Sequence, residues 1–287
     1  MGMPVKKLKN GFAMPVFGIG TWYMGGGLEA DTRNDEKDIH ALRASMDVGI
    51  THIDSAELYG RGHAEELVGQ AIQGRNRSTL FLVSKVFKEH LKHEDVLASC
   101  RASLGRLGTE YLDLYLVHAP NPDIPIRETM KAFDELKEQG LIKNIGVSNF
   151  NVEQLEAARA ATKNPIVVDQ LHYSLAYRTW QDAVEYCEEN DILITAYRPV
   201  ERGVLTTPGV AILDAMCRKY KKTPAQVAIQ WLISQDNVVT IAKMSSADHL
   251  NENLGALGWN MDIRDVEKLK KEFPEVELPR TVVKFEK

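Results

Sequence analysis

The amino-acid sequence predicts an α/β protein with the (β/α)8 TIM barrel fold, in a single domain that spans residues 1–287. Three observations support this prediction. A length of 287 residues is ordinary for one such barrel. Short apolar runs alternate with segments of helical periodicity, as parallel strands alternate with their crossover helices. Neither an internal repeat nor a linker divides the chain.

The chain is expected to open with a β-hairpin, because Asn10-Gly11 lies between two short strand-like segments. The hairpin is followed by eight segments of strand character, most of them apolar as expected for strands covered on both faces. These predicted strands are residues 16–20, 51–54, 80–84, 112–117, 142–147, 166–168, 192–196 and 238–241.

The segments between the strands show helical spacing of apolar residues. In the first of them Ile39, Leu42 and Met46 share one face. Gly140 is a suitable C-cap, and Thr223-Pro224 has the residues that favour a helix start. The predicted helices are residues 36–48, 64–72, 96–107, 126–138, 152–161, 180–189, 209–220, a helix from 224 onward, 247–254, and an extra amphipathic C-terminal helix at 262–273 before a polar tail.

Composition excludes several classes of protein. Hydrophobic residues make up 44% of the chain and charged residues 26%, as in soluble globular proteins, and the net charge of -5 gives no basic surface for nucleic acid. No apolar run reaches the ~18 residues that a membrane-spanning helix needs. The segment from Met1 to Lys6 has neither the apolar core of a signal peptide nor a myristoylation pattern.

The cysteines favour a reducing compartment. Cys100, Cys187 and Cys217 are few and scattered, without a CxxC pair, so no disulfide framework is expected. We therefore expect a cytoplasmic protein that associates with neither membrane nor nucleic acid. The glycine-rich segment Gly25-Gly26-Gly27 lacks the GxGxxG pattern that opens a Rossmann domain.

Ionisable residues follow three consecutive predicted strands. Asp54, Lys85 and His118 each stand at a strand's carboxyl end, and Tyr59 follows in the loop after Asp54. In a parallel barrel these ends meet at one mouth, where the active site lies. Such residues could also form a buried structural network, but several of them in successive strands favour chemistry.

In order and local context Asp54, Tyr59, Lys85 and His118 match the catalytic tetrad of the aldo-keto reductase superfamily. The chain resembles this family over nearly its whole length, and is most similar to prokaryotic-type members with a short C-terminal loop. The resemblance implies reduction of aldehydes or ketones by hydride transfer from NADPH. Tyr59 would be the general acid, with a pKa lowered from ~10 by Lys85. Asp54 would hold Lys85, and His118 would polarise the substrate carbonyl.

The resemblance also implies a cofactor site. The segment Gly146-Val147-Ser148-Asn149-Phe150 is similar to a family signature whose Ser and Asn bind the nicotinamide carboxamide, and Gln170 matches the third ligand. Tyr197 matches the aromatic that stacks on the nicotinamide, although it could be merely a rim aromatic. The remaining residues implied on the cofactor are Gly20, Thr21, Trp22, Asp54, Arg198, Pro199, Arg202, Lys243, His249, Glu252 and Asn253.

Two departures from the family pattern concern the pocket for the cofactor's 2′-phosphate. Met244 replaces the usual Ser and His249 the usual Arg, while Lys243 is retained. A largely neutral His cannot copy the charged fork of Arg, so NADPH is expected but NADH is also possible. Arg198 also departs from the usual small residue. With Arg202 it could contact the pyrophosphate, or it could be a solvated rim charge.

Trp22, Tyr23, Tyr59 and His118 are expected to bind the substrate, although Trp22 could instead pack in the core. The short chain after Phe273 suggests an open, tolerant pocket. No HExxH motif or other ligand cluster indicates a metal, which disfavours a metal-dependent isomerase or hydrolase. The expected protein is a monomer with a small-molecule carbonyl substrate. The alternative function is a cofactor-binding regulatory subunit of the same fold.

Overall fold

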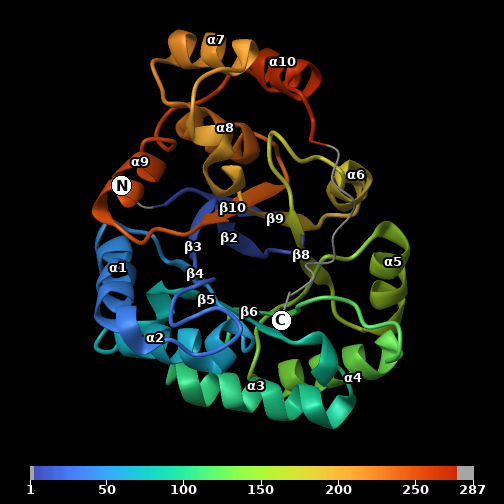
Figure 1. Cartoon of the computed structure of the whole chain (residues 1–287). Helices are drawn as coiled ribbons and strands as arrows, with labels where there is room; N and C mark the ends of the chain where they lie inside the picture. The colour runs from blue at the N-terminus through green and yellow to red at the C-terminus, as the bar shows by residue number, and fades with distance from the viewer. Residues whose placement is uncertain (1–2, 277–287) are drawn as a thin grey trace.

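Eight short strands close into a parallel barrel in the computed structural model, which describes residues 3–276. Figure 1 shows them surrounded by the helices, in the order β10-β3-β4-β5-β6-β7-β8-β9. The strands are β3 (Phe17–Gly20), β4 (His52–Asp54), β5 (Phe81–Val86), β6 (Leu114–Val117), β7 (Ile145–Ser148), β8 (Ile166–His172), β9 (Leu193–Tyr197) and β10 (Val238–Ala242). The predicted (β/α)8 TIM barrel is confirmed.

The helices form an outer ring because each buries one apolar face on the strands. In Figure 1, α7 and α10 lie beside each other outside this ring. The helices are α1 (Asp35–Asp47), α2 (His63–Ile72), α3 (His93–Leu107), α4 (Ile126–Glu138), α5 (Val152–Ala161), α6 (Gln181–Glu189), α7 (Ala211–Tyr220), α8 (Pro224–Ile233), α9 (Ala247–Leu254) and α10 (Ile263–Glu272). Among residues 3–276, none of these helices combines the length and apolarity needed to cross a bilayer.

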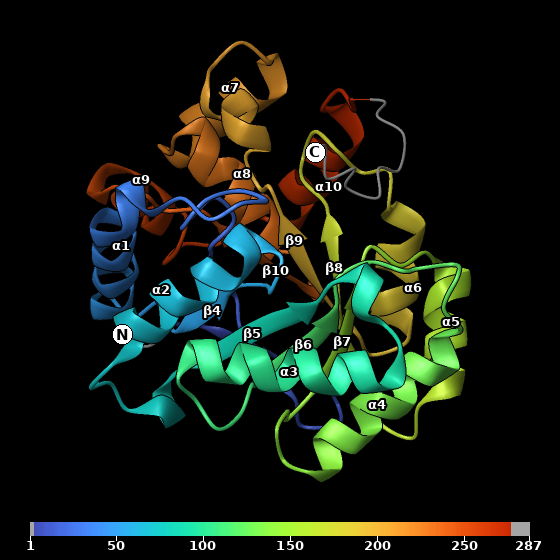
Figure 2. The same cartoon turned by 60° about the horizontal axis from the view of Figure 1, so that its bottom comes forward.

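An antiparallel hairpin of β1 (Val5–Lys7) and β2 (Ala13–Pro15) precedes the barrel, as predicted. It closes the end from which the strands start. Leu8, Phe12 and Met14 pack in one cluster with barrel-filling residues such as Val83 and Val239. With that end filled by apolar side chains, the functional site is left to the opposite, carboxyl end of the strands. Figure 2 shows the barrel from a second direction, with α3 in front of its strands.

Some predicted boundaries are wrong. Strand β8 was expected to end at 168 but continues to His172, because residues 168–172 pair with residues 193–197 of β9. Strands β6 and β7 begin later than predicted, since Leu112 and Ile142 meet only in an isolated bridge. Residues 1–2 and 277–287 lie outside the described part, and with them the expectations for the start of the chain and for the polar tail.

Candidate active site

Four candidate catalytic residues meet at the carboxyl end of the barrel. Side chains alternate along a strand, so Asp54 of β4 and Lys85 of β5 both point into the barrel. Lys85 is completely buried, and its Nζ donates to Asp54 Oδ1 at 2.5 Å, Ser55 O at 2.8 Å and Tyr59 Oη at 3.3 Å. All three ammonium donors are therefore used, two of them on groups with a proposed chemical role.

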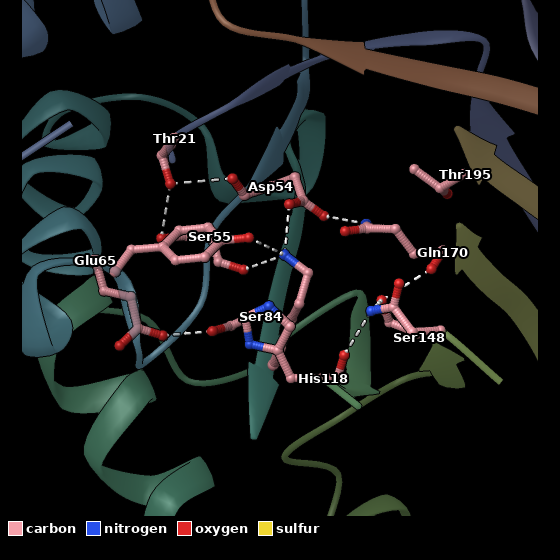
Figure 3. A network of polar contacts seen from close by, with 12 residues as sticks. Thr21, Asp54, Ser55, Glu65, Ser84, His118, Ser148, Gln170 and Thr195 are labelled. Carbon is pink, nitrogen blue, oxygen red and sulfur yellow. Dashed lines mark hydrogen bonds and ion pairs between the residues drawn. The ribbon is translucent and has the colours of Figure 1, made fainter. Parts of the chain in front are cut away.

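A hydrogen-bonded network continues from Asp54 across the barrel (Figure 3). Gln170 Nε2 donates to Asp54 Oδ2 at 2.8 Å, and Ser148 Oγ donates to Gln170 O at 2.8 Å. On the far side of β5, the Ser84 hydroxyl donates to the buried Glu65 of α2. The strand that carries Lys85 is thus held from both sides, which fixes the ammonium in place.

The charge of Lys85 is retained inside the barrel. Burial acts to lower the pKa of Lys85, but the neighbouring Asp54 carboxylate and the Tyr59 hydroxyl outweigh it and raise the pKa above its ordinary value. An ammonium buried without such partners would lose its proton instead. The Asp54–Lys85 pair therefore supplies a fixed positive charge directly beside the phenol.

The pKa of Tyr59 differs from the prediction. Burial raises the pKa of Tyr59, Lys85 lowers it, and the nearby Asp54 raises it again, so the balance lies above the ordinary value of 10. The prediction of a lowered pKa is therefore wrong for this state of the site. A raised pKa is compatible with a proton donor, because the phenol keeps its proton until it reacts. The adjacent Lys85 ammonium can then stabilise the phenolate that remains after donation.

His118 is neutral in this site. Burial, followed by the positive charge of Lys85, holds the pKa of His118 well below its usual range. The ring centroids of His118 and Tyr59 are 5.6 Å apart, and Trp22 meets Tyr59 edge-on at 4.8 Å. A neutral imidazole beside the phenol can hydrogen-bond a carbonyl oxygen without competing electrostatically with Lys85.

A tight turn delivers Tyr59 to this position. Its backbone N–H donates to Ala56 O at 3.0 Å, and the next residues, Gly60 and Arg61, have positive φ angles of 55° and 53°. Gly60 N donates to Gly27 O at 2.7 Å, and a Cβ on Gly60 would lie 2.4 Å from Gly25 O. Only glycine allows the two backbones to approach this closely.

A cavity of about 670 Å³ opens above the four residues, a size within the usual range for ligand sites. All predicted site residues except Lys85 line it, and Lys85 lies buried beneath Tyr59. Residues that the sequence did not indicate also line it, namely Val200, Gly203, Thr206, Ala225, Ile241, Ala242 and Ser245. Adjacent parts of the mouth are thus built from segments far apart in the chain.

Amide and hydroxyl groups on one wall of the cavity are held in place by hydrogen bonds to one another. Asn149, at a positive φ of 64°, donates through Nδ2 to His118 O at 3.0 Å and to Ser148 Oγ at 2.9 Å. Tyr197 Oη donates to Asn149 Oδ1 at 2.9 Å. This wall presents several oriented polar groups that could bind a carboxamide, as the resemblance implied for Ser148, Asn149 and Gln170.

Met244, one of the two departures from the family pattern, does not line the cavity. Met244 is only 1% exposed and packs in the main core, whereas the next residue, Ser245, lines the cavity. The Met244 side chain, which was expected at the 2′-phosphate pocket, therefore packs in the core instead. His249 and Lys243 do line the cavity, and Lys243 Nζ donates to Tyr23 O at 3.0 Å.

Asp169 precedes Gln170 on β8 and is fully buried, on the outer face of the barrel. Burial raises the pKa of Asp169 well above its usual range, and the N–H of Phe150 offsets this only in part. Such a carboxyl stabilises the fold below pH ~4, and this contribution is lost as the pH rises because only the unfolded chain ionises freely. Asp169→Asn is expected to stabilise the protein at pH 8 by about 1–3 kcal/mol and hardly at pH 4.

Urea unfolding at both pH values tests this expectation, with the exposed Asp123→Asn as the control. An equal effect of Asp169→Asn at pH 4 and pH 8 would contradict it.

His172 and its neighbour Glu201 lie near the site and received no role from the sequence. His172, at the end of β8, stacks on Tyr197 and on Tyr177, and its Nε2 lies 2.9 Å from Glu201 Oε1. Strand alternation places His172 on the same inner face as Gln170. This position of His172 could have been predicted only if the strand had been extended to residue 172.

In the described part of the chain, no three His, Cys, Asp or Glu side chains gather as metal ligands.

The model of the Aldo/keto reductase family matches residues 16–272, which include every candidate residue above. The chain belongs to the aldo/keto reductase family. It is therefore an oxidoreductase, and the family predicted from the sequence is confirmed.

Curated relatives and solved structures agree with this assignment. The chain is 33% identical to methylglyoxal reductase YeaE of Escherichia coli, covering 91% of this chain and 92% of the relative. It is 34% identical to a glyoxal reductase of Bacillus subtilis, covering 92% and 90%. A structure of the thermostable aldo-keto reductase Tm1743 with epalrestat matches with a TM-score of 0.89 and 40% identity, over 93% and 99% of the chains. An NADPH complex of an aldo-keto reductase from Klebsiella pneumoniae matches with a TM-score of 0.84 and 34% identity, over 98% of both.

Proposed function

We propose that this aldo-keto reductase reduces aldehydes and ketones to alcohols with NADPH, and that Tyr59 donates the proton. The observation that carries the proposal is the position of the Tyr59 hydroxyl, 3.3 Å from a fully buried Lys85 ammonium. Tyr59 and His118 also line the cavity, so a bound carbonyl oxygen can reach both rings. The alternative, a regulatory subunit with little turnover, has no observation that favours it.

Each of the candidate catalytic residues has a separate role in the proposed reaction. His118, neutral and buried, orients and polarises the carbonyl oxygen. Tyr59 gives its proton to that oxygen, and the resulting phenolate is stabilised by the adjacent Lys85 ammonium. Asp54 keeps Lys85 charged through a 2.5 Å contact. Gln170 in turn holds the second oxygen of Asp54, so the carboxylate cannot rotate away from the ammonium.

The cavity fits a nicotinamide dinucleotide. Ser148, Asn149 and Gln170 would hold the carboxamide beside Tyr197 at the catalytic end. Lys243 and His249 also line the cavity, and a phosphate of the cofactor would bind there. When bound, this cofactor supplies the hydride that no side chain can provide. NADPH is proposed as the preferred form, as in the Klebsiella pneumoniae complex, with weaker discrimination against NADH because His249 lacks the charged fork of Arg.

Small reactive aldehydes are the proposed substrate class. The relatives named as methylglyoxal and glyoxal reductases support this choice. The aromatic walls of Trp22 and Tyr23 also favour a compact carbonyl compound. We further propose that the enzyme acts as a monomer in the cytoplasm, without a nucleic acid or membrane partner, and gel filtration would test the monomer.

A direct assay tests the proposed function. The protein is mixed with NADPH and a panel that contains glyoxal, methylglyoxal, aromatic aldehydes and ketones, and loss of reduced cofactor is followed by its near-ultraviolet absorbance. Turnover of at least the aldehydes is expected. Tight NADPH binding without turnover of any carbonyl compound would favour the regulatory subunit instead.

Arg198 offers a separate test of the cofactor site. It lines the cavity at a positive φ of 59°, with its guanidinium 5.8 Å from the Tyr197 ring centroid. If Arg198 contacts the pyrophosphate, Arg198→Ala is expected to raise the KM for NADPH about tenfold and to leave kcat nearly unchanged, since a charged hydrogen bond is lost. The exposed Arg264→Ala serves as control. An unchanged KM for both NADPH and NADH would discard the pyrophosphate role.

A further inference from the structure

Three rings are stacked at the catalytic end of the cavity. His172 lies between Tyr177, at a centroid distance of 3.9 Å and an interplanar angle of 15°, and Tyr197, at 5.3 Å and 17°. Tyr177 and His172 are buried, and Tyr197 forms the cavity wall. The ring plane of Tyr197 therefore depends on the position of His172 behind it.

His172 is also the attachment point of a neighbouring segment. Its Nε2 lies 2.9 Å from Oε1 and 3.0 Å from Oε2 of Glu201, so both carboxylate oxygens face the ring. The Ser174 hydroxyl donates to the same carboxylate and accepts from the Tyr177 N–H at 3.1 Å. The Glu201 side chain is 15% exposed and that of His172 only 3%, so these contacts are largely shielded from water.

Glu201 belongs to residues 198–206, a segment that lines the cavity next to Tyr197. Arg198, Arg202 and Thr206 of this segment line the cavity. Arg198, Glu201 and Arg202 all have positive φ angles, of 59°, 47° and 53°. Non-glycine residues adopt this conformation only where the surrounding structure holds them. The Glu201 carboxylate is a side-chain tether of this segment to the barrel, and the buried Leu205 is a second anchor.

We propose that His172 and Glu201 are positioning residues for the cofactor. The pair links the Tyr197 ring to the segment 198–206. Together with the hydrogen bond from Tyr197 to Asn149, this contact positions the two surfaces that would enclose the nicotinamide and pyrophosphate. The inference rests on the proposed function, because it requires a dinucleotide in the cavity. It predicts control of cofactor affinity and release rather than of the proton transfer at Tyr59.

Two variants isolate the contact. Glu201→Ala removes the carboxylate, and His172→Phe keeps a ring between Tyr177 and Tyr197 while removing Nε2. Glu201→Gln retains an acceptor for His172 and is the conservative rescue. Val204→Ala is the matched control, because Val204 belongs to the same segment but is 66% exposed and does not line the cavity. The wild-type enzyme and all variants are compared by NADPH binding, cofactor dissociation rate and turnover.

Glu201→Ala and His172→Phe are each expected to weaken NADPH binding about tenfold and to speed its dissociation, since a charged hydrogen bond is lost. The double variant should lose no more than either single one, because both changes break the same contact. The aldehyde KM at saturating NADPH should stay within about twofold, and Glu201→Gln and Val204→Ala should bind NADPH within about threefold of wild type.

Other outcomes overturn the inference. Variants that lower the melting temperature but bind NADPH like wild type would show a purely structural contact. Additive losses in the double variant would show that His172 and Glu201 act separately. A wild-type protein that neither binds NADPH nor reduces aldehydes would refute the proposed function and this inference together, whereas normal wild-type activity with unaffected variants refutes the inference alone.

Discussion

Tyr59→Phe is expected to lower kcat for aldehyde reduction by about 10²- to 10⁴-fold, the usual contribution of a positioned general acid. The substitution removes only the hydroxyl that lies 3.3 Å from Lys85 Nζ. The ring contacts with Trp22 and His118 are preserved, so NADPH affinity should stay close to that of wild type. Stopped-flow turnover and fluorescence titration with NADPH measure the two quantities separately.

The matched control is Tyr111→Phe, because Tyr111 precedes β6 at the opposite end of the barrel and packs under Arg77 and Lys143. It should retain wild-type turnover. If Tyr59→Phe were as fast as the parent enzyme, the proton would have to come from elsewhere, and the neutral His118 would become the candidate donor.

Lys85→Met is expected to damage both stability and turnover. It removes the cation from a fully buried pair and leaves the Asp54 carboxylate to the hydrogen bond from the Gln170 amide, at 2.8 Å. Breaking a buried ion pair from one side typically costs about 3–5 kcal/mol. Turnover should fall as well, since the phenolate formed at Tyr59 loses its neighbouring positive charge. Urea unfolding and steady-state kinetics measure the two effects.

The double variant Asp54→Leu/Lys85→Met separates stability from chemistry. Replacing both charges by apolar groups avoids an unpaired buried charge, so most of the lost stability should return. Activity should not return, because Tyr59 still lacks its ammonium. Recovery of turnover in the double variant, or full stability in Lys85→Met, would contradict the role assigned to this pair.

The fold, and the meeting of the candidate residues at one mouth of the barrel, could be predicted because both depend on where the strands end. Asp54, Lys85 and His118 each follow a recognisable strand, and parallel topology then brings those ends to one mouth. Tyr59 could be added because a short loop joins it to Asp54. These relations depend on order and spacing along the chain, which the sequence contains directly.

Two kinds of property could not be predicted. One is a pKa that depends on opposing effects, and the other is the direction in which a single side chain points. The pKa of Tyr59 is decided by burial acting against Lys85, and the degree of burial is known only from the packed structure. Met244 and Ser245 are adjacent, and only the backbone path after β10 decides which of them faces the cavity. His172 was missed because its strand continues beyond the apolar run that marked it.

The hairpin at the start of the chain has a further consequence for turnover. Among the described residues, Leu8, Phe12 and Met14 fill the end of the barrel from which the strands start. The cavity therefore opens to solvent at the carboxyl end of the strands. In the proposed reaction, substrate, product and the proton that returns to Tyr59 would all pass the rim formed by Trp22, Tyr197 and the residues after it. Exchange through this opening would then be a step of the proposed reaction that is separate from proton transfer at Tyr59.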